Sequence, residues 1–211
     1  MNASTWAILA LTAGIAGADW FAVGSSIRTL EYVAKPAFML GLIAAAIAMR
    51  PANALERELF IVALVCGLVS DVLLMLPRDL FVGGLAAALL EHLAYIFGFL
   101  TRDFHLGLFA VAAGVALASF LVIMPGVYRA LRRTKPSLTA PVITYACVIV
   151  VMVARAGGTG SGLALAGALL FLYSDSLLAW NRFVRPVRAG RLANMVMYHA
   201  GQALLVLSLL T

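Results

Sequence analysis

Eight apolar segments, each close to the length of a membrane-crossing helix, follow one another along the 211-residue chain. A helix needs roughly 20 mostly apolar residues to cross the hydrocarbon core of a bilayer. The segments lie at about residues 5–21, 30–49, 59–77, 81–100, 106–124, 137–154, 161–180 and 193–210. With 64% hydrophobic and 11% charged residues, the composition excludes an ordinary soluble domain. We therefore expect an integral membrane protein.

The pattern within the segments favours helices over the strands of a closed barrel. Spanning strands alternate apolar and polar residues, whereas stretches such as 61–67 and 86–90 are continuously apolar. The connections are short and leave no room for a soluble domain. The sequence predicts an all-α, polytopic bundle of about eight transmembrane helices that forms a single domain over residues 1–211.

The net charge of +6 is explained by topology, without a nucleic-acid partner. Of the fifteen Lys and Arg residues, eleven fall in the first, third, fifth and seventh loops. These are Arg28, Lys35, Arg78, Arg129, Arg132, Arg133, Lys135, Arg182, Arg185, Arg188 and Arg191. Because cytoplasmic loops carry an excess of basic residues, we expect these loops inside and both termini outside, in a bacterial inner membrane.

The pattern S-D-x-L-L occurs twice, at residues 70–74 and 174–178, within strongly apolar segments. Each copy places a carboxylate, Asp71 or Asp175, where lipid or protein interior is expected. Such a charge costs roughly 2.5 to 3.5 kcal/mol on insertion scales, so intramembrane acids indicate a functional site. The alternative is a buried salt bridge, to Lys35 or an arginine, that only orients the bundle.

Further paired features suggest an internal duplication. Asp71 and Asp175 are offset by 104 residues, and Lys-Pro dipeptides at 35–36 and 135–136 by 100. Tyr95 and Tyr198 each follow one of the acids in the next segment. The order predicts two four-helix halves with the same orientation, at about residues 1–105 and 106–211.

This topology predicts a polar pocket that opens toward the cytoplasmic leaflet. It places Asp71 and Asp175 at the same depth. Lys35 lies at the cytoplasmic end of its segment, His199 lies toward the cytoplasmic side, and His92 lies nearer to the middle. Two neighbouring carboxylates in a poorly hydrated site titrate differently, so that one is protonated while the other is ionised, as acid–base catalysis requires. Apolar helix faces around the pocket are suited to an acyl or alkyl chain.

The sequence gives no sign of a metal site or a phosphate-binding loop. The chain has three histidines and no H-E-x-x-H motif or Cys/His cluster, so we expect neither a metal nor another cofactor. The glycine-rich stretch at residues 157–162 has no preceding strand and no following Gly-Lys-Ser/Thr. We interpret it as a tight turn on the outer side.

Taken in order, these motifs resemble the YhhN/TMEM86 family of integral membrane lysoplasmalogenases. The resemblance covers nearly the whole chain and depends on several short stretches. They are Lys35-Pro36, residues 67–75, residues 81–85, residues 92–95, residues 174–179, Asn181-Arg182-Phe183, Tyr198 and Gln202. Two positions depart from the family pattern: Ser70 stands where a glycine is common, and His199 where another aromatic residue is expected. The second departure favours Gln202 over His199 as a shared polar group.

The resemblance implies hydrolysis of the vinyl-ether bond of 1-alkenyl lysophospholipids, with ethanolamine or choline headgroups, to a fatty aldehyde and a glycerophospho-base. Asp71 and Asp175 would form the acid–base pair, and Lys35 would contact the phosphate. Substrate or water would be oriented by His92, Tyr95, Tyr198, His199 and Gln202. Partners would be the lysophospholipid and membrane lipids.

A second class of function is a small lipid-binding membrane protein or a proton-coupled transporter, since duplicated halves and intramembrane acids also occur in transporters. The predicted position of both acids toward one leaflet favours the hydrolase. The sequence leaves open the headgroup and chain length, which aspartate is the acid, and the oligomeric state.

Overall fold

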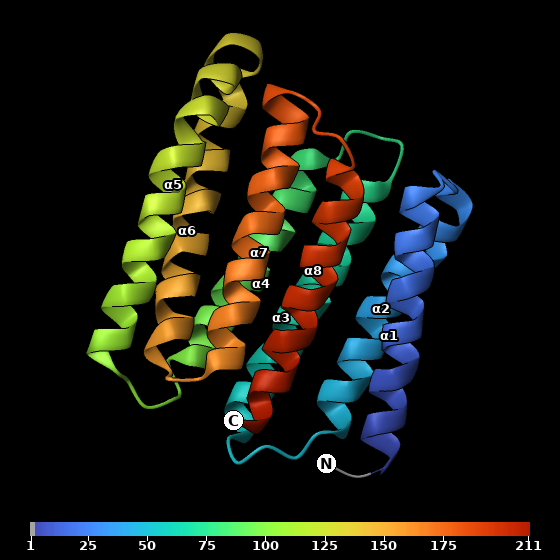
Figure 1. Cartoon of the computed structure of the whole chain (residues 1–211), viewed down its shortest axis with the longest axis vertical. Helices are drawn as coiled ribbons and strands as arrows, with labels where there is room; N and C mark the ends of the chain where they lie inside the picture. The colour runs from blue at the N-terminus through green and yellow to red at the C-terminus, as the bar shows by residue number, and fades with distance from the viewer. Residues whose placement is uncertain (1–2) are drawn as a thin grey trace. The chain divides into compact units, whose positions relative to one another are not determined.

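A computed structural model describes residues 3–211, and these residues fold into eight α-helices without a strand (Figure 1). The helices are α1 (Ala3–Gly24), α2 (Arg28–Ala48), α3 (Ala54–Met75), α4 (Phe81–Phe99), α5 (Leu106–Thr134), α6 (Thr139–Gly158), α7 (Gly162–Ala179) and α8 (Gly190–Leu207). All eight are long and apolar enough to cross a membrane. The predicted all-α, multi-pass membrane architecture is confirmed.

Two helices begin or end away from the predicted positions, for local reasons. Helix α3 begins at Ala54, earlier than the predicted 59, because the side chain of Asn53 caps it by accepting a hydrogen bond from the Glu56 amide at 3.1 Å. Helix α5 runs through Pro125 to Thr134, whereas the prediction ended this segment at residue 124.

The basic residues predicted for the fifth loop therefore lie on the last turns of α5 instead. Arg129 follows one turn after Pro125, and its Nε donates a hydrogen bond to the Pro125 carbonyl at 3.1 Å. Arg132 and Arg133 occupy the final turn, where positive charge interacts favourably with the negative end of the helix dipole. Proline interrupts the backbone ladder at one point without ending the helix.

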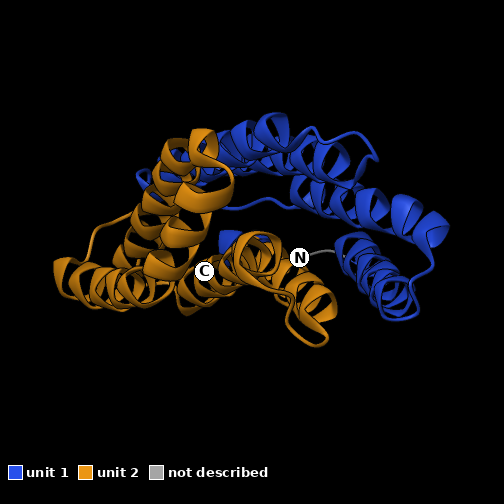
Figure 2. Cartoon of the chain, turned by 90° about the horizontal axis from the view of Figure 1, so that it is seen from above, with its two compact units in different colours: residues 1–101, 206–211 blue, residues 102–205 orange. Residues whose placement is uncertain are grey.

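The chain divides into two compact units, coloured separately in Figure 2. The first runs to Thr101 and also includes Val206–Thr211. Within it, α1 packs on α2, α2 on α3, and α3 on α4. Its aromatic core centres on Phe60, whose ring meets Tyr95 and Phe99 edge to face at centroid distances of 4.9 and 5.4 Å. These contacts fix α4 against α3.

The second unit is Arg102–Leu205. Within it, α5 packs on α6 and α6 on α7, and a π-helical extension of α7, Trp180–Val184, contacts α5 and α7. Helices α7 and α8 cross at two glycines. A Cβ at Gly167 would lie 2.9 Å from the Gly201 carbonyl oxygen, and one at Gly201 would lie 3.0 Å from that of Gly167. Small residues thus bring the two backbones into direct contact.

The glycine-rich stretch forms the short turn that was predicted. Helix α6 ends at Gly158, and α7 begins at Gly162. Between them, Gly160 has a φ of +77°, a left-handed conformation that glycine adopts without steric cost. The side chain of Ser161 then caps α7 by accepting a hydrogen bond from the Ala164 amide at 3.3 Å.

The two Lys-Pro dipeptides occupy different structural positions. Lys35 and Pro36 lie inside α2, where Lys35 is buried. Lys135 follows the end of α5, and Pro136 opens a short 3₁₀ turn, both exposed. The two Lys-Pro dipeptides are therefore not structurally equivalent. The internal duplication stays a prediction that depends on the paired S-D-x-L-L motifs and tyrosines.

Candidate active site

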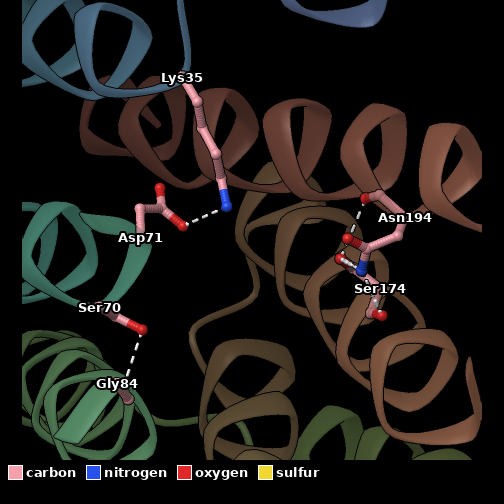
Figure 3. A network of polar contacts seen from close by, with 6 residues as sticks. All are labelled: Lys35, Ser70, Asp71, Gly84, Ser174 and Asn194. Carbon is pink, nitrogen blue, oxygen red and sulfur yellow. Dashed lines mark hydrogen bonds and ion pairs between the residues drawn. The ribbon is translucent and has the colours of Figure 1, made fainter. Parts of the chain in front are cut away.

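The carboxylate of the first S-D-x-L-L motif forms a buried ion pair within the first unit (Figure 3). Nζ of Lys35, in the second turn of α2, lies 2.8 Å from Oδ1 of Asp71, in the last turns of α3. The two side chains are only 10% and 7% exposed. The ion pair that sequence reasoning offered as a structural alternative is therefore present, and it joins two of the predicted site residues.

Neighbouring positions of the same motif hold α3 against α4. The Ser70 hydroxyl donates to the Gly84 carbonyl at 2.9 Å. A Cβ on Gly84 would lie 2.5 Å from the Leu74 side chain, so Ser70 and Leu74 both meet the backbone of α4 at one point. Residues four apart share a helix face, whereas Asp71 is turned by about 100° from Ser70. The serine thus faces α4 and the aspartate faces α2.

The second motif repeats this arrangement within the second unit. The Ser174 hydroxyl donates to the backbone carbonyl of Asn194, in α8, at 3.1 Å. In return, Nδ2 of Asn194 donates to the Ser174 carbonyl at 2.7 Å and to its Oγ at 2.9 Å (Figure 3). Both residues are buried. The serine of each motif therefore ties its helix to the helix that follows.

Asp175 has a different partner from Asp71. The Tyr145 hydroxyl, on α6, donates a hydrogen bond to Oδ2 of Asp175. Each aspartate thus contacts the helix before its own, α2 for Asp71 and α6 for Asp175, but meets an ammonium in one unit and a phenol in the other. Both Asp175 and Tyr145 are half-buried.

Sequence reasoning missed Tyr145, although a signal for it existed. Lys35 lies seven residues after the start of α2, and Tyr145 lies six residues after the start of α6. Comparing the two halves by helix position would have paired these residues. The Lys-Pro dipeptides instead led the comparison to Lys135, which lies outside α6.

The predicted residues of α4 are buried in the first unit. His92 and Tyr95 have no exposed surface, and the Tyr95 ring belongs to the aromatic core around Phe60. The adjacent Glu91 is 1% exposed and lies against α3, where a Cβ on Gly67 would be 2.5 Å from its Oε1. A larger residue at position 67 would require this carboxylate to move.

The predicted residues of α8 are equally buried, in the second unit. Tyr198, His199 and Gln202 are 6%, 1% and 0% exposed. The Tyr198 ring packs edge to face on Phe171 of α7 at a centroid distance of 5.5 Å. The close glycine contact between α7 and α8 therefore fixes this row of polar side chains beside the helix that carries Asp175.

The structure thus assigns Lys35, Asp71, His92 and Tyr95 to the first unit, and Asp175 with the α8 residues to the second. The pairing of Asp71 with Asp175 stays a prediction. Within residues 3–211, no three His, Cys, Asp or Glu side chains form a group that could hold a metal ion.

A sequence profile described as the YhhN family matches residues 30–209, a range that includes every candidate site residue. The chain is also similar to curated proteins named lysoplasmalogenase TMEM86B. The human protein is 36% identical over 150 residues, which cover 70% of this chain and 62% of the relative. The pig protein is 35% identical over 150 residues, covering 69% and 61% of the two chains.

The rat protein is 33% identical over 148 residues, covering 70% of this chain and 60% of its own. The matches thus span about three fifths of the length of these relatives. No solved structure gives a significant match.

Proposed function

The chain belongs to the YhhN family, and from this premise we propose that it hydrolyses the vinyl-ether bond of 1-alkenyl lysophospholipids within a membrane. The observation that carries the proposal is the 36% identity, over 150 residues, to a protein named a lysoplasmalogenase. The proposed substrates carry ethanolamine or choline headgroups, and the products are a fatty aldehyde and a glycerophospho-base. The buried acids in the two S-D-x-L-L motifs supply suitable groups for this reaction.

The difficult step in such a hydrolysis is the transfer of a proton to carbon. An acid protonates the vinyl carbon farther from the ether oxygen, and positive charge develops on the other carbon and on the oxygen. This oxocarbenium ion resembles the charged state in glycoside hydrolysis, where one carboxylic acid gives a proton and a second carboxylate stabilises the cation or activates water. We propose that Asp71 and Asp175 share these two tasks.

Water then attacks the cationic carbon, and the resulting hemiacetal collapses to the aldehyde and the free glycerol hydroxyl. The reaction consumes one water and needs no oxidant, nucleotide or metal ion. A fixed negative charge in a poorly hydrated site stabilises the developing cation more than the same charge would in water. The enclosed position of Asp71 supports such a role.

The remaining predicted residues are proposed to bind and orient the substrate. Lys35 carries three N–H donors, so its contact with Asp71 is compatible with a second contact to the phosphate. His92 and Tyr95 on α4, and Tyr198, His199 and Gln202 on α8, are proposed to orient the headgroup or the attacking water. We place the protein in a bacterial inner membrane, with both termini outside, on the distribution of its basic residues.

The proposal is tested by incubating the detergent-purified chain with a 1-alkenyl lysophospholipid and with its 1-acyl counterpart, and measuring fatty aldehyde. We expect aldehyde from the vinyl ether alone. Both Asp71→Asn and Asp175→Asn should lower the rate by about 100-fold or more, since positioned acids and bases contribute roughly 10² to 10⁴. Gel filtration of each variant controls for folding.

Wild-type protein that is folded but releases no aldehyde, for either headgroup and across a range of pH, contradicts the proposal. Binding of the lipid without turnover would then favour the second class of function, a lipid-binding protein or transporter. Aldehyde release that survives both substitutions would keep the hydrolase and remove the two aspartates from its mechanism.

A further inference from the structure

The second unit carries most of the basic residues of the chain. It contains ten basic and two acidic residues, whereas the first unit contains five and seven. Eight of the ten lie in two short segments, residues 129–135 and 182–191, and all eight are exposed. Neither segment contains an acidic residue. We call these two segments the basic end of the second unit.

Contacts between α5 and the π-helical extension of α7 place both segments at the same end of the unit (Figure 1). A Cβ at Gly126, on α5, would lie 2.7 Å from the ring of Trp180, so the two elements approach closely here. Arg133 lies seven residues farther along α5, on the same helix face and about 10 Å nearer to its end. The arginines of α5 therefore continue from the face that meets the α7 extension.

The length of α5 places this end in the headgroup region of a bilayer. Its 29 residues span about 44 Å at 1.5 Å per residue, whereas the hydrocarbon core is roughly 30 Å thick. Because residues 106–124 carry no charge, the excess length lies at the basic end. Tyr128, which is 43% exposed on the same turns, is a residue typical of the membrane–water interface. The arginines around it therefore lie at the depth of the lipid phosphates.

The loop that joins the α7 extension to α8 is shaped by contacts with Asn181. Oδ1 of Asn181 accepts a hydrogen bond from the Val187 amide at 2.8 Å. On the other side, a Cβ at Gly190 would lie 2.5 Å from Nδ2 of Asn181, so the amide sits against the backbone where α8 begins. Between them, Ala189 adopts a φ of +55°, which is unfavourable for a residue with a side chain. The backbone that carries the loop arginines is therefore held in a specific shape.

Membrane topology explains the number of these basic residues but not the order of the loop. The excess of Lys and Arg in cytoplasmic loops depends on their count and not on a fixed backbone. Strained backbone persists only where surrounding contacts impose it, and it is concentrated at functional sites. Arginines on a fixed backbone can present paired N–H donors to the oxygens of one phosphate.

We propose that the basic end binds the phosphate groups of anionic membrane phospholipids. Arg185 and Arg188 of the loop make the main contacts, and Asn181 positions them. The occupant is a lipid of the surrounding bilayer, because the site lies at headgroup depth and beside the exposed apolar side chains of Tyr128 and Val187. Positive charge without acidic neighbours complements such headgroups. This site is separate from the proposed hydrolysis and does not depend on it.

The test measures which phospholipids stay bound to the purified chain. The protein is equilibrated in uncharged detergent micelles that contain equal amounts of dioleoyl phosphatidylglycerol and dioleoyl phosphatidylcholine, and the lipids that remain after affinity purification are quantified by mass spectrometry. We expect at least about fivefold enrichment of phosphatidylglycerol at about 0.15 M salt, since each basic residue near an anionic surface contributes on that order. The enrichment should fall at about 0.5 M salt because of screening. Equal retention of the two lipids overturns the proposal.

Charge-matched variants separate a site from a diffuse effect of net charge. Arg185→Gln combined with Arg188→Gln should lower the enrichment by about fivefold or more. Arg50→Gln combined with Arg78→Gln is the matched control, because it removes two exposed arginines from the first unit and should keep the wild-type enrichment. An equal loss in both double variants would overturn the proposed site.

Asn181→Ala tests the loop itself, because it leaves the net charge unchanged. Loss of the bond to the Val187 amide should lower the enrichment by about threefold or more, since the arginines are then no longer held in the binding arrangement. Wild-type enrichment in this variant, with gel filtration showing a folded protein, refutes the positioning role of Asn181.

Glycerol phosphate, a soluble analogue of the headgroup, provides the last comparison. At the same concentration as the lipid it should leave the bound phosphatidylglycerol unchanged, because it lacks acyl chains that hold it at the membrane. Displacement of the lipid would assign the basic end to a soluble phosphate ester and overturn the lipid as its occupant. None of these measurements uses aldehyde release, so their outcome is independent of the hydrolase.

Discussion

Neutralising Lys35 should destabilise the protein strongly, because it leaves the Asp71 charge buried without its partner. The two charged atoms are 2.8 Å apart and the side chains are 10% and 7% exposed. At an effective dielectric constant of 20, their attraction is about 6 kcal/mol before desolvation is considered. Removing one member of such a buried pair typically costs about 3 to 5 kcal/mol. We expect Lys35→Met to lower the free energy of unfolding by about 3 kcal/mol.

Replacing both residues should cost much less than the two single changes added together. The double variant Lys35→Met with Asp71→Leu removes both charges of the pair together, and such replacements are often close to neutral. A double-mutant cycle should therefore give a coupling energy of about 2 to 3 kcal/mol. Additive costs would refute the reasoning that the pair is buried and directly coupled.

Unfolding in detergent or lipid bicelles, followed by circular dichroism against denaturant, provides the measurement. Glu58→Gln is a matched control, since Glu58 pairs with Arg57 at the same distance of 2.8 Å but is 60% exposed. Exposed pairs contribute roughly 0 to 1 kcal/mol, so this variant should stay within about 1 kcal/mol of wild type.

Three further substitutions test the packing that positions the site. Gly167→Val should destabilise the protein by about 2 kcal/mol or more, because its Cβ would lie 2.9 Å from the α8 backbone. Gly14→Ala should not, because a Cβ at position 14 has no atom within 4 Å. Thermal unfolding of the two variants provides the comparison. Phe60→Ala should cost about 3 to 5 kcal/mol by emptying the aromatic core, measured by denaturant unfolding. Asn194→Leu should cost about 2 kcal/mol, since the carbonyl and Oγ of buried Ser174 lose the two hydrogen bonds that Nδ2 of Asn194 donates. An unfolding midpoint equal to that of wild type would contradict this.

The eight helices were predictable from the sequence because the bilayer sets the length and polarity of any element that crosses it. All eight apolar segments are helices in the structure, and the tight turn at Gly160 was expected from its glycines. The end of α5 was not predictable from local signals, because Pro125 interrupts one hydrogen bond of the helix without stopping it. The basic residues beyond it were therefore placed in a loop.

The two aspartates were also identified from the sequence, because a carboxylate in an apolar segment is costly wherever its helix packs. Helical periodicity further shows that Ser70 and Asp71 face different directions. It does not show which helix each one faces, since neighbours are chosen by packing across the whole unit. The Lys35–Asp71 ion pair was accordingly only one of several alternatives.

The sequence by itself determined that the chain lies in a bilayer, how many helices it forms and where costly buried charges occur. Each of these depends on the free energy of transferring a single segment from water into lipid. Only the tertiary structure decided the partners: an ammonium for Asp71, and for Asp175 a tyrosine that no motif marked. The second Lys-Pro dipeptide, at Lys135, was misleading. The partner of a side chain depends on its position in a packed helix and not on the residue that follows it in the sequence.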